Sequence, residues 1–349
     1  MSSGGIDSGY ASGTFLGVRF SVRGAIINLV LAVFSAVLVI LLMGVGDFPL
    51  SVDEVLAALG GGGDDFNRLV VLEWRLPVAL SALVFGALLG LGGAIFQSLT
   101  RNPLGSPDII GFDSGAYTAV LVTMLLFKVR DYWSIAGVSI LGGLITAALV
   151  YVLAFRRGIQ GFRLIIVGIA LSSMLGSLDS YLITRADIQD AMTVGFWGAG
   201  SLSRSTWSNI VPATILAALV CLAAAVLSPS MRQQELGDDA AVAHGVRITR
   251  DRLLLIVLGV ASTAIVTAAA GPIGFIALAA PQIAQRLARA PGITLTTSIF
   301  TGAALLSLAH AVSVLLGAMF RPIPAGLVTV CLGGCYFIYL LIKETRRRL

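Results

Sequence analysis

The amino-acid sequence predicts an all-α integral membrane protein with about ten transmembrane helices and both termini in the cytoplasm. Hydrophobic residues make up 57% of its 349 residues and charged residues only 12%, whereas soluble domains carry about 25% charged residues. The apolar residues gather in runs of about 20 or more, the length that crosses a bilayer. Arginine and lysine are distributed unequally among the connecting segments, which orients the chain in the membrane.

The N-terminal segment predicts a tail followed by a retained first span. Residues 1–18 are rich in glycine and serine and have no basic start, so we expect a disordered cytoplasmic tail rather than a signal peptide. The apolar run that follows is about 23 residues long, which exceeds the hydrophobic region of a signal peptide and suffices for a span. Residues 19–349 are therefore expected to form one transmembrane domain.

Charge-free apolar runs mark the expected spans. The run 253–285 is too long for one span without strong tilt, and it contains the helix breaker Gly271-Pro272. Dividing the run there gives two spans joined by a non-helical segment, which is tolerated at membrane depth only where protein or a water-filled path covers it. The ten expected spans are 24–46, 76–100, 109–127, 132–155, 164–184, 205–231, 253–270, 273–288, 290–320 and 322–342.

The distribution of basic residues decides between nine and ten spans. With ten spans and a cytoplasmic N-terminus, the cytoplasmic segments carry sixteen arginines and lysines and the external segments carry seven. With nine, Arg286, Arg289 and the basic C-terminal end would change sides, so the asymmetry would fall. The positive-inside rule therefore favours ten. The net charge of +5 reflects this orientation, and no nucleic-acid partner is expected.

The segment between the first two spans is acidic and is expected outside the cell membrane. It holds a Ser51 that precedes VDEVLAAL, and serine is a preferred residue at the start of a helix. Residues 51–59 are therefore expected to form a short surface helix. The acidic residues of the segment are Asp47, Asp53, Glu54, Asp64, Asp65 and Glu73.

The residues that bind nucleotides or metals, or that catalyse reactions, are few and scattered. Neither lysine, Lys128 or Lys343, follows glycine or precedes serine or threonine, as a phosphate-binding loop requires. His244 and His310 are far apart, with no HExxH or CxxC pattern near them, and the three cysteines lie in apolar runs. We therefore expect no catalytic site, metal site or resident cofactor, and any ATP that drives this protein must bind another polypeptide.

Carboxylates at membrane depth are the remaining candidates for chemistry. Burying such a group costs at least a few kcal/mol, and Asp113 and Asp179 both fall within expected spans. A proton relay would need a chain of such groups, and these two are isolated. Asp179 is therefore a candidate residue of the substrate pathway. Ion-coupled transport is the weaker alternative for the function of the chain.

Three connecting segments have more specific sequences than ordinary turns. Residues 102–116 form a segment rich in proline and glycine that runs into a span, and 271–287 hold a short helix between Pro272 and Pro281. Residues 235–252 are a polar cytoplasmic insertion with a short alanine-rich helix that Gly245 ends. A small-residue helix that projects into the cytoplasm suits the groove of a partner protein, although a solvated loop would also fit this pattern.

Seven ordered blocks resemble the permease subunits of the FecCD-type ABC importers, which carry iron-siderophores, haem and cobalamin. The resemblance runs from about residue 24 to 345, and within the family it is greatest to ferric-enterobactin permeases. The blocks are EWRLP at 73–77, GAIFQSLTRNPLGSPDIIGF at 93–112, FRLIIVGIAL at 162–171, FWGAGSL at 196–202, LGDDAAVAHGV at 236–246, GPIGFIALAAPQIAQR at 271–286 and PAGLVTVCLGG at 324–334.

The resemblance implies a fold like that of the cobalamin permease, spanning the bacterial inner membrane many times in contact with lipid. Two permease subunits, identical or paralogous, would pair in the membrane, and two ABC ATPase subunits that bind the ATP would dock beneath them. An external binding protein would deliver the substrate, expected to be a ferric siderophore of the catecholate, enterobactin-like class.

The resemblance also implies roles for individual residues. The loop 232–252 would contain the element that sits in a cleft of the ATPase, and Arg75 and Arg321 would meet acidic side chains of the binding protein. The pathway and gating candidates are Asp179, Asn102, Pro103, Gly271 and Pro272. The ATPase-coupling candidates are Leu236, Gly237, Asp238, Asp239, Ala240, Ala241, Ala243 and Gly245.

Two positions depart from the family pattern, and other functions stay open. Val78 stands where the cobalamin permease has an arginine, so the contact with the binding protein is expected to differ, and Gln282 stands where many members have histidine. A haem or cobalamin permease would share this architecture. An ion-coupled secondary transporter and an intramembrane enzyme are the alternatives from other classes, and the enzyme is disfavoured by the lack of a catalytic constellation.

Overall fold

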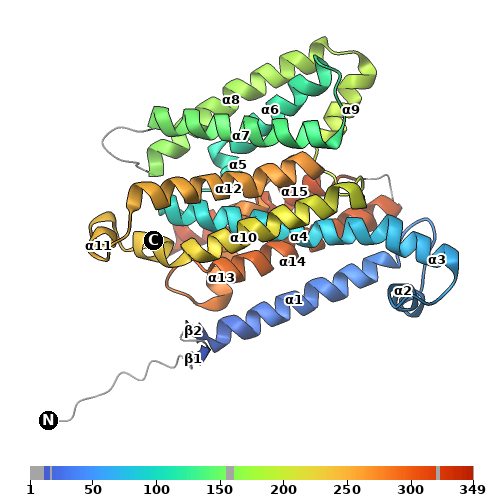
Figure 1. The fold of residues 1–349 in the computed structure, drawn as a ribbon, viewed down its shortest axis with the longest axis horizontal. Helices are drawn as coiled ribbons and strands as arrows, with labels where there is room; N and C mark the ends of the chain where they lie inside the picture. The colour runs from blue at the N-terminus through green and yellow to red at the C-terminus, as the bar shows by residue number, and fades with distance from the viewer. Residues whose placement is uncertain (1–11, 16–17, 155–160, 320–322, 349) are drawn as a thin grey trace.

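The computed structural model describes residues 12–15, 18–154, 161–319 and 323–348, and almost all of them are helical (Figure 1). Arg321 lies outside the described residues. The helices are α1 (Val22–Met43), α2 (Val52–Leu59), α3 (Asp65–Leu69), the π-helix η1 (Val70–Arg75), α4 (Leu76–Thr100), α5 (Pro107–Ile110), α6 (Phe112–Leu125), α7 (Tyr132–Ala154), α8 (Gly161–Arg185), α9 (Ile188–Gly198), α10 (Trp207–Glu235), α11 (Asp238–Ala243), α12 (Ile248–Ala270), α13 (Ile276–Ala288), α14 (Leu295–Met319) and α15 (Ala325–Arg348).

The chain is a multi-pass membrane protein. Each of the ten predicted spans contains a described helix, and seven helical stretches are long and apolar enough to cross a membrane. The helices α6, α13 and α15 are the exceptions, because their apolar parts are shorter than a full span. Two of them follow breaks, since α6 begins after Gly111 (φ +87°) and α13 begins after a non-helical stretch at 271–275. The count of ten therefore stays a prediction.

A two-stranded antiparallel hairpin precedes the first span. β1 (Ser12–Phe15) and β2 (Val18–Ser21) pair so that Ser12 lies opposite Ser21. We expected no regular structure before residue 19, so β1 departs from that prediction. The local sequence explains the departure, because Thr14, Phe15, Val18 and Phe20 are β-branched or aromatic residues, which favour extended backbone.

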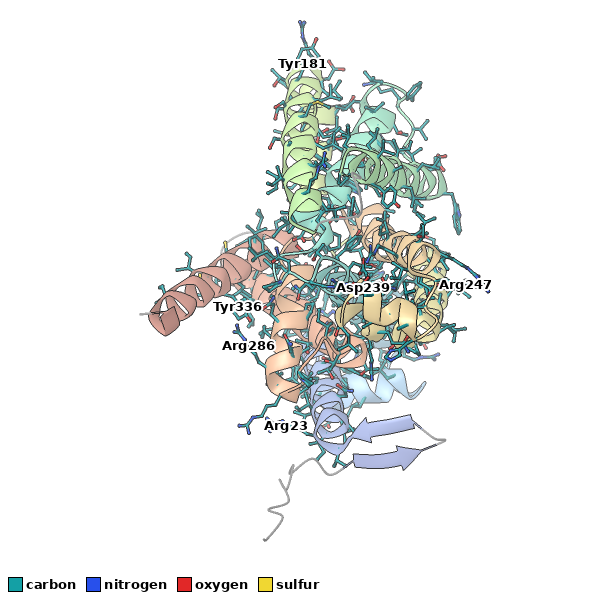
Figure 2. All side chains as sticks on the ribbon, turned by 90° about the vertical axis from the view of Figure 1, so that its left-hand side faces the viewer. Arg23, Tyr181, Asp239, Arg247, Arg286 and Tyr336 are labelled. Carbon is teal, nitrogen blue, oxygen red and sulfur yellow. The ribbon has the colours of Figure 1, made fainter. Side chains whose placement is uncertain are left out.

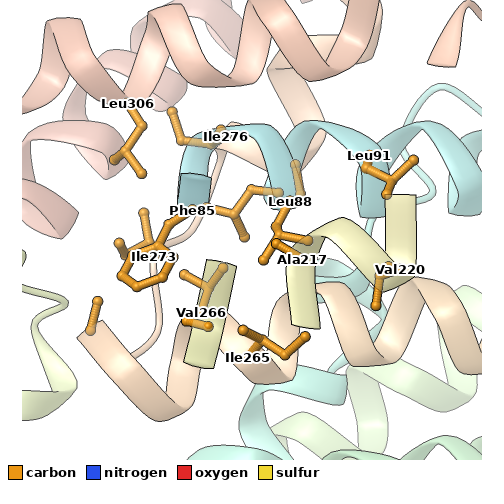
Figure 3. Close-up of a cluster of buried hydrophobic side chains, with 14 of the residues drawn as sticks. Phe85, Leu88, Leu91, Ala217, Val220, Ile265, Val266, Ile273, Ile276 and Leu306 are labelled. Carbon is orange, nitrogen blue, oxygen red and sulfur yellow. The ribbon is translucent and has the colours of Figure 1, made fainter. Parts of the chain in front are cut away.

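Helix α4 lies at the centre of the bundle. Figure 1 shows α10, α12, α13 and α14 around it, with α6, α7 and α8 grouped on one side and α1 on the other. Figure 3 shows the main apolar cluster, in which Phe85 and Leu88 of α4 meet Ala217 of α10, Ile265 of α12 and Leu306 of α14. Packing between helices, rather than exclusion of water, stabilises such a core inside a membrane.

Glycines let the backbones of α4 and α14 touch. A Cβ atom added at Gly90 would lie 2.2 Å from the Ser298 carbonyl oxygen, and one at Gly302 would lie 2.1 Å from the Gly86 oxygen. Small residues at these positions bring two helix axes close and increase van der Waals contact. The helices α4 and α14 are thus the most extensively packed pair of the bundle.

The predicted break at Gly271-Pro272 is confirmed. α12 ends at Ala270, Gly271 adopts φ +80°, and α13 begins at Ile276. Gly271 and Ile273 are buried, so neighbouring helices cover the unwound backbone, as a non-helical segment at membrane depth requires.

The predicted surface helix at 51–59 is also confirmed. α2 follows Ser51, whose hydroxyl accepts a hydrogen bond from the Glu54 N–H while the Glu54 carboxylate accepts one from the Ser51 N–H. This reciprocal arrangement is a capping box. The hydrogen bonds from Ser51 hold the pKa of Glu54 below its ordinary value.

The bundle has two ends of different character. The hairpin and α11 lie at one end, which we name the α11 end, whereas α2, α3 and α9 lie at the other, the α9 end (Figure 1). Figure 2 looks onto the α11 end, where Arg23, Arg247 and Arg286 are spread across the surface. The Arg23 Nε donates to the Leu287 carbonyl oxygen at 2.9 Å, which ties the start of α1 to α13.

Candidate functional site

At the α11 end, the short alanine-rich helix forms where it was predicted. α11 (Asp238–Ala243) is followed by Gly245, which adopts φ +81°. The Val246 N–H donates to the Ala241 oxygen at 3.0 Å, and the Gly245 N–H donates to the Val242 oxygen at 2.9 Å. This is the hydrogen bonding of a Schellman motif, in which a glycine in the left-handed region ends the helix. The helix and its end are confirmed, and its coupling role stays a prediction.

A single carboxylate anchors α11 to two long helices. Asp238 Oδ1 accepts hydrogen bonds from Arg101 Nη2 at 2.5 Å and from Arg252 Nη2 at 2.9 Å. Arg101 also donates to the Gln234 carbonyl oxygen, with Nη2 at 2.6 Å and Nε at 3.1 Å. Burial raises the pKa of Asp238, but Arg252 and Arg101 outweigh it and hold that pKa below its ordinary value. This carboxylate therefore joins α11 to the end of α4 and the start of α12, and Arg101 adds the end of α10.

The remaining side chains of α11 divide into a buried and an exposed set. Ala241 is fully buried, whereas Val242 is 60% exposed and Leu236, just before the helix, is 72% exposed. Asp239 and Ala243 are also exposed, and Ala240 is half-buried. We call the exposed set, Leu236, Asp239, Val242 and Ala243, the coupling face. Two large apolar side chains exposed outside the spans fit a surface that another protein covers.

The segments 102–116 and 271–287, singled out separately from the sequence, pack against each other. The Gln97 side-chain amide donates to the Leu278 oxygen at 2.9 Å, and the Gln282 amide donates to the Pro103 oxygen at 2.8 Å. Both bonds join the α4 side of the bundle to α13. The departure from the family pattern at Gln282 therefore places a side-chain amide where it can bond this turn.

Asn102 and Asp108 shape the turn after α4. Asn102 Oδ1 accepts from the Leu104 N–H at 2.9 Å, which closes an Asx turn. Asp108 Oδ2 accepts from the Phe275 N–H at 2.9 Å, at the start of α13. The turn thus holds the unwound segment in place, and the gating roles of Asn102 and Pro103 stay predictions.

At the α9 end, the break at Gly271-Pro272 meets two other segments. The Ser201 N–H donates to the Ala270 oxygen at 2.8 Å, and the Gly326 N–H donates to the Gly200 oxygen at 2.8 Å. A Cβ atom at Gly200 would lie 2.4 Å from the Pro272 oxygen. We call the three close glycines, Gly200, Gly271 and Gly326, the glycine junction. It links the end of α9, the break after α12 and the start of α15.

Helix α8 exposes a polar stripe at membrane depth. Each hydroxyl of the stripe donates to the carbonyl oxygen four residues earlier, at 2.8–2.9 Å, which leaves the lone pairs of its oxygen open to an external donor. A polar exposed face inside a span does not suit lipid, and it indicates a second protein surface or an aqueous path. The α8 stripe consists of Ser173, Ser177, Ser180 and Thr184.

Asp179 faces away from the α8 stripe. Its side chain is 6% exposed and lies against Thr118 and Tyr117 of α6. Within the described residues, its Oδ1 has no hydrogen-bond partner. The sequence predicted Asp179 as a pathway residue, and that role stays a prediction, since the structure places the carboxylate between α8 and α6.

Helix α9 is tethered by a carboxylate that two cations share. Asp190 accepts hydrogen bonds from Lys128 and Arg130, which lie in the connection between α6 and α7. Its side chain is only 11% exposed. The hydrogen bond from Lys128, followed by the charges of both cations, holds the pKa of Asp190 below its ordinary value, although burial opposes this.

Replacing Asp190 with asparagine is expected to lower the melting temperature of the purified protein by about 2–4 °C, because two cations lose their counter-ion. A lowered pKa means that the carboxylate contributes fully above the ordinary value of 3.8 and loses its contribution only as the pH falls through the lowered pKa. The difference between D190N and the parent should therefore be constant from about pH 5 to 8. Differential scanning fluorimetry measures it.

The matched control for this prediction is D187N. Asp187 is the exposed N-cap residue of the same helix, and its side chain makes no capping hydrogen bond. Its replacement should leave the melting temperature within about 1 °C of the parent. A D190N difference that disappears between pH 5 and 8 would mean that Asp190 titrates there, which contradicts the prediction.

The predicted docking residue Arg75 is already occupied within the chain. Its Nη1 donates to the Met43 oxygen at 2.5 Å and its Nη2 donates to the Phe48 oxygen at 2.6 Å. These bonds cap the end of α1 and hold the connection to α2. The role of Arg75 in docking stays a prediction, as does that of Arg321, which lies outside the described residues.

Among the described residues, no three histidine, cysteine, aspartate or glutamate side chains gather closely enough to hold a metal ion. The sequence did not reveal Arg101, Arg252 and Asp190 as anchoring residues, because their partners lie 14 to 137 residues away along the chain. For Arg101, the sequence feature that could have identified it is its position just before Asn102-Pro103, in a turn with an unusual sequence.

The chain is similar to known transport proteins over most of its length. The sequence profile of the FecCD transport family matches residues 31–343. The ferric enterobactin transport system permease protein FepG of Escherichia coli (strain K12) is 47% identical over 305 residues, which cover 87% of this chain and 91% of FepG. The protein FepD of the same strain, described as a permease of the same transport system, is 30% identical over 328 residues, covering 92% and 96% of the two chains.

A solved structure supports the same relationship. A metal-chelate type ABC transporter in an inward-facing conformation superimposes with a TM-score of 0.77 and 27% sequence identity. The match covers 92% of this chain and 99% of the other. The predicted resemblance to permeases of the ferric-enterobactin type is thus confirmed.

Proposed function

The chain belongs to the FecCD transport family, and we propose that it is the permease subunit of an ABC importer that carries a ferric siderophore across the bacterial inner membrane. The substrate class is a catecholate of the enterobactin type, because FepG is the relative with 47% identity over 87% of the chain. The ferric siderophore is cargo, and the chain itself holds no cofactor.

The α8 stripe is the observation that carries the pathway proposal. A row of exposed hydroxyl oxygens on a membrane-spanning helix offers hydrogen-bond acceptors to a polar environment, so α8 lines the substrate path. A second permease subunit closes this path from the other side. Two distinct permease proteins of one system, FepG and FepD, are both similar to this chain, which favours a paralogous partner over a second copy.

The α11 end is the cytoplasmic end in this proposal. It carries the basic residues that the positive-inside rule assigns to the cytoplasm, among them Arg23, Arg247 and Arg286 (Figure 2). The chain then crosses the membrane ten times, with both termini inside. The α9 end faces the outside, where an external binding protein docks near Arg75 and Arg321.

Two ATPase subunits supply the energy, and the coupling face of α11 is their docking element. ATP binds those subunits, since neither lysine of this chain stands in a phosphate-binding loop. A push on α11 reaches α4 and α12 through Asp238, because Arg101 and Arg252 hold that carboxylate. ATP binding shifts the pore between two states only if it favours one of them.

The gating proposal rests on the two breaks in the helices. The turn at Asn102-Pro103 bonds to α13 through Gln282, and Gly271-Pro272 belongs to the glycine junction. Motion of α13 would therefore reach α9 and α15 at the outer end. Asp179, between α8 and α6, would fix the pathway helix rather than touch the substrate.

Uptake measurements in bacteria test the substrate class. Cells without their own inner-membrane siderophore permeases would express this chain with its partner permease, ATPase and binding protein. We expect uptake of radioactive iron from ferric enterobactin, and none of haem or cobalamin. Uptake of haem or cobalamin without uptake of the ferric catecholate would contradict the proposed substrate class. It would still agree with the assignment of the chain as an ABC importer permease.

A further inference from the structure

A cavity of about 260 Å³ opens at the α9 end beside Arg204. Its wall is formed by Phe196 of α9, by Ser201, Ser203 and Arg204 of the loop that follows, and by Ile323 and Pro324 just before α15. Ligand pockets for whole small molecules have volumes of about 300–1,000 Å³. This cavity therefore suits one arm of a bulky chelate rather than a complete one.

Backbone hydrogen bonds fix the walls of the cavity relative to each other. The Ser201 N–H bonds to the Ala270 oxygen and the Gly326 N–H bonds to the Gly200 oxygen, both at 2.8 Å. The loop with Arg204 is thus joined to the end of α12 and to the start of α15. The cavity therefore adjoins the glycine junction, whose hydrogen bonds hold two of its walls together.

The donors of Arg204, like those of Arg185 over the Tyr181 ring, are used by no described residue, whereas three other cations of this end are engaged. Lys128 and Arg130 share Asp190, and Arg75 bonds two carbonyl oxygens. Within the described part of the chain, Arg204 makes neither a salt bridge nor a hydrogen bond. Burial lowers its pKa, but an arginine pKa starts so far above neutrality that the side chain stays charged. Arg204 is exposed as a whole, so an anion can reach it, and a cation without a counter-ion attracts one.

The lining identifies the kind of anion. A guanidinium presents a planar fork of N–H donors that matches paired oxygens, and Ser201 and Ser203 add hydroxyl groups. Phe196 is 65% exposed, and with Ile323 and Pro324 it offers an apolar wall to a flat ring. An aromatic ring with two anionic oxygens satisfies both surfaces at once, because each oxygen keeps lone pairs for hydrogen bonds while it ligates iron.

We propose that the cavity beside Arg204 is an anion-binding station that receives one catecholate arm of the incoming chelate. This inference rests on the proposed function and names the first contact of the substrate with this chain. An acidic side chain of the binding protein is the competing occupant, but a recess with an aromatic wall fits a ring better than a carboxylate.

The test uses the complete importer in proteoliposomes, with loaded binding protein outside and ATP inside. R204Q is expected to lower the maximal uptake rate of ferric enterobactin at least tenfold, while the half-saturating concentration of loaded binding protein stays the same. R204K keeps the charge without the fork and should lie between R204Q and the parent. The matched control is R68Q, since Arg68 lies on α3 and pairs with Asp65 instead, and it should transport like the parent.

Three results would overturn the inference. R204Q and R204K at the parental rate would show that no anion depends on this side chain. A shift in the half-saturating concentration of the binding protein, with or without a fall in rate, would assign Arg204 to docking. If R204K transported as slowly as R204Q, and both had parental melting temperatures, a positive charge at this position would not support uptake. That result would contradict an anion-binding site. A parent importer that carries no ferric catecholate would instead refute the proposed function itself.

Discussion

Replacing Gly90 with leucine is expected to abolish the accumulation of folded protein in the membrane. A Cβ atom there would lie 2.2 Å from the Ser298 oxygen and 3.2 Å from the Gly302 Cα. Both atoms belong to the backbone of α14, so the clash is relieved only if α4 and α14 separate. Overpacking of a core usually costs about 1–3 kcal/mol, and a clash of side chain with backbone along the central helix pair exceeds that range. Size-exclusion chromatography of a fluorescent fusion in detergent measures the folded fraction.

The matched control is a leucine at Gly137 of α7. A Cβ atom there would meet no atom within 4 Å, and the residue is exposed. G137L should therefore give the same monodisperse peak as the parent. A G90L protein with parental yield and melting temperature would contradict the close approach of α4 and α14.

Reversing the charge of Asp238 is expected to reduce ATP-driven uptake to less than about a tenth of the parental rate while the chain still folds. D238R would place a third cation beside Arg101 and Arg252, and α11 would lose its connection to α4 and α12. Hydrogen bonds to charged groups contribute about 1.5–3 kcal/mol each, and the half-exposed position of Asp238 reduces that figure through solvent screening. Uptake and ATP hydrolysis would be measured on the same reconstituted complex.

Two further variants separate coupling from stability. D238E keeps the charge and should retain most of the uptake. The double variant D238R/R101D exchanges the two charges and restores one ion pair. It should therefore recover part of the ATP-driven uptake. Parental uptake per ATP in D238R would show that the contacts of Arg101 and Arg252 do not transmit force.

Local features of this fold follow from the sequence, because neighbouring residues determine them. Gly245 ends α11 through its own positive φ, Ser51 and Glu54 cap α2 within four residues, and Gly271-Pro272 breaks α12. The apolar runs mark the helices for the same reason. The hairpin β1–β2 was missed because glycine and serine dominate residues 1–13 and obscure the short β-favouring stretch that follows.

Features that depend on two distant segments did not follow from the sequence. Asp179 is a carboxylate in a span, but only the packing of α8 on α6 decides that it faces Tyr117 and Thr118 instead of the α8 stripe. The family pattern suggested that Arg75 is available to bind another protein. In the structure, both of its Nη atoms donate hydrogen bonds to carbonyl oxygens of the same chain. The number of spans is open for a related reason, since α13 has only 13 residues and its path depends on the unwound backbone before it.

We propose that this chain is a passive permease driven by a separate ATPase. Reconstitution into liposomes tests it most directly, with the partner permease and loaded binding protein present in every sample and the ATPase present or absent. We predict that ferric siderophore accumulates only when both the ATPase and ATP are present, and that a proton or sodium gradient alone drives nothing. Accumulation without the ATPase, under an ion gradient, would contradict the account and identify a secondary transporter.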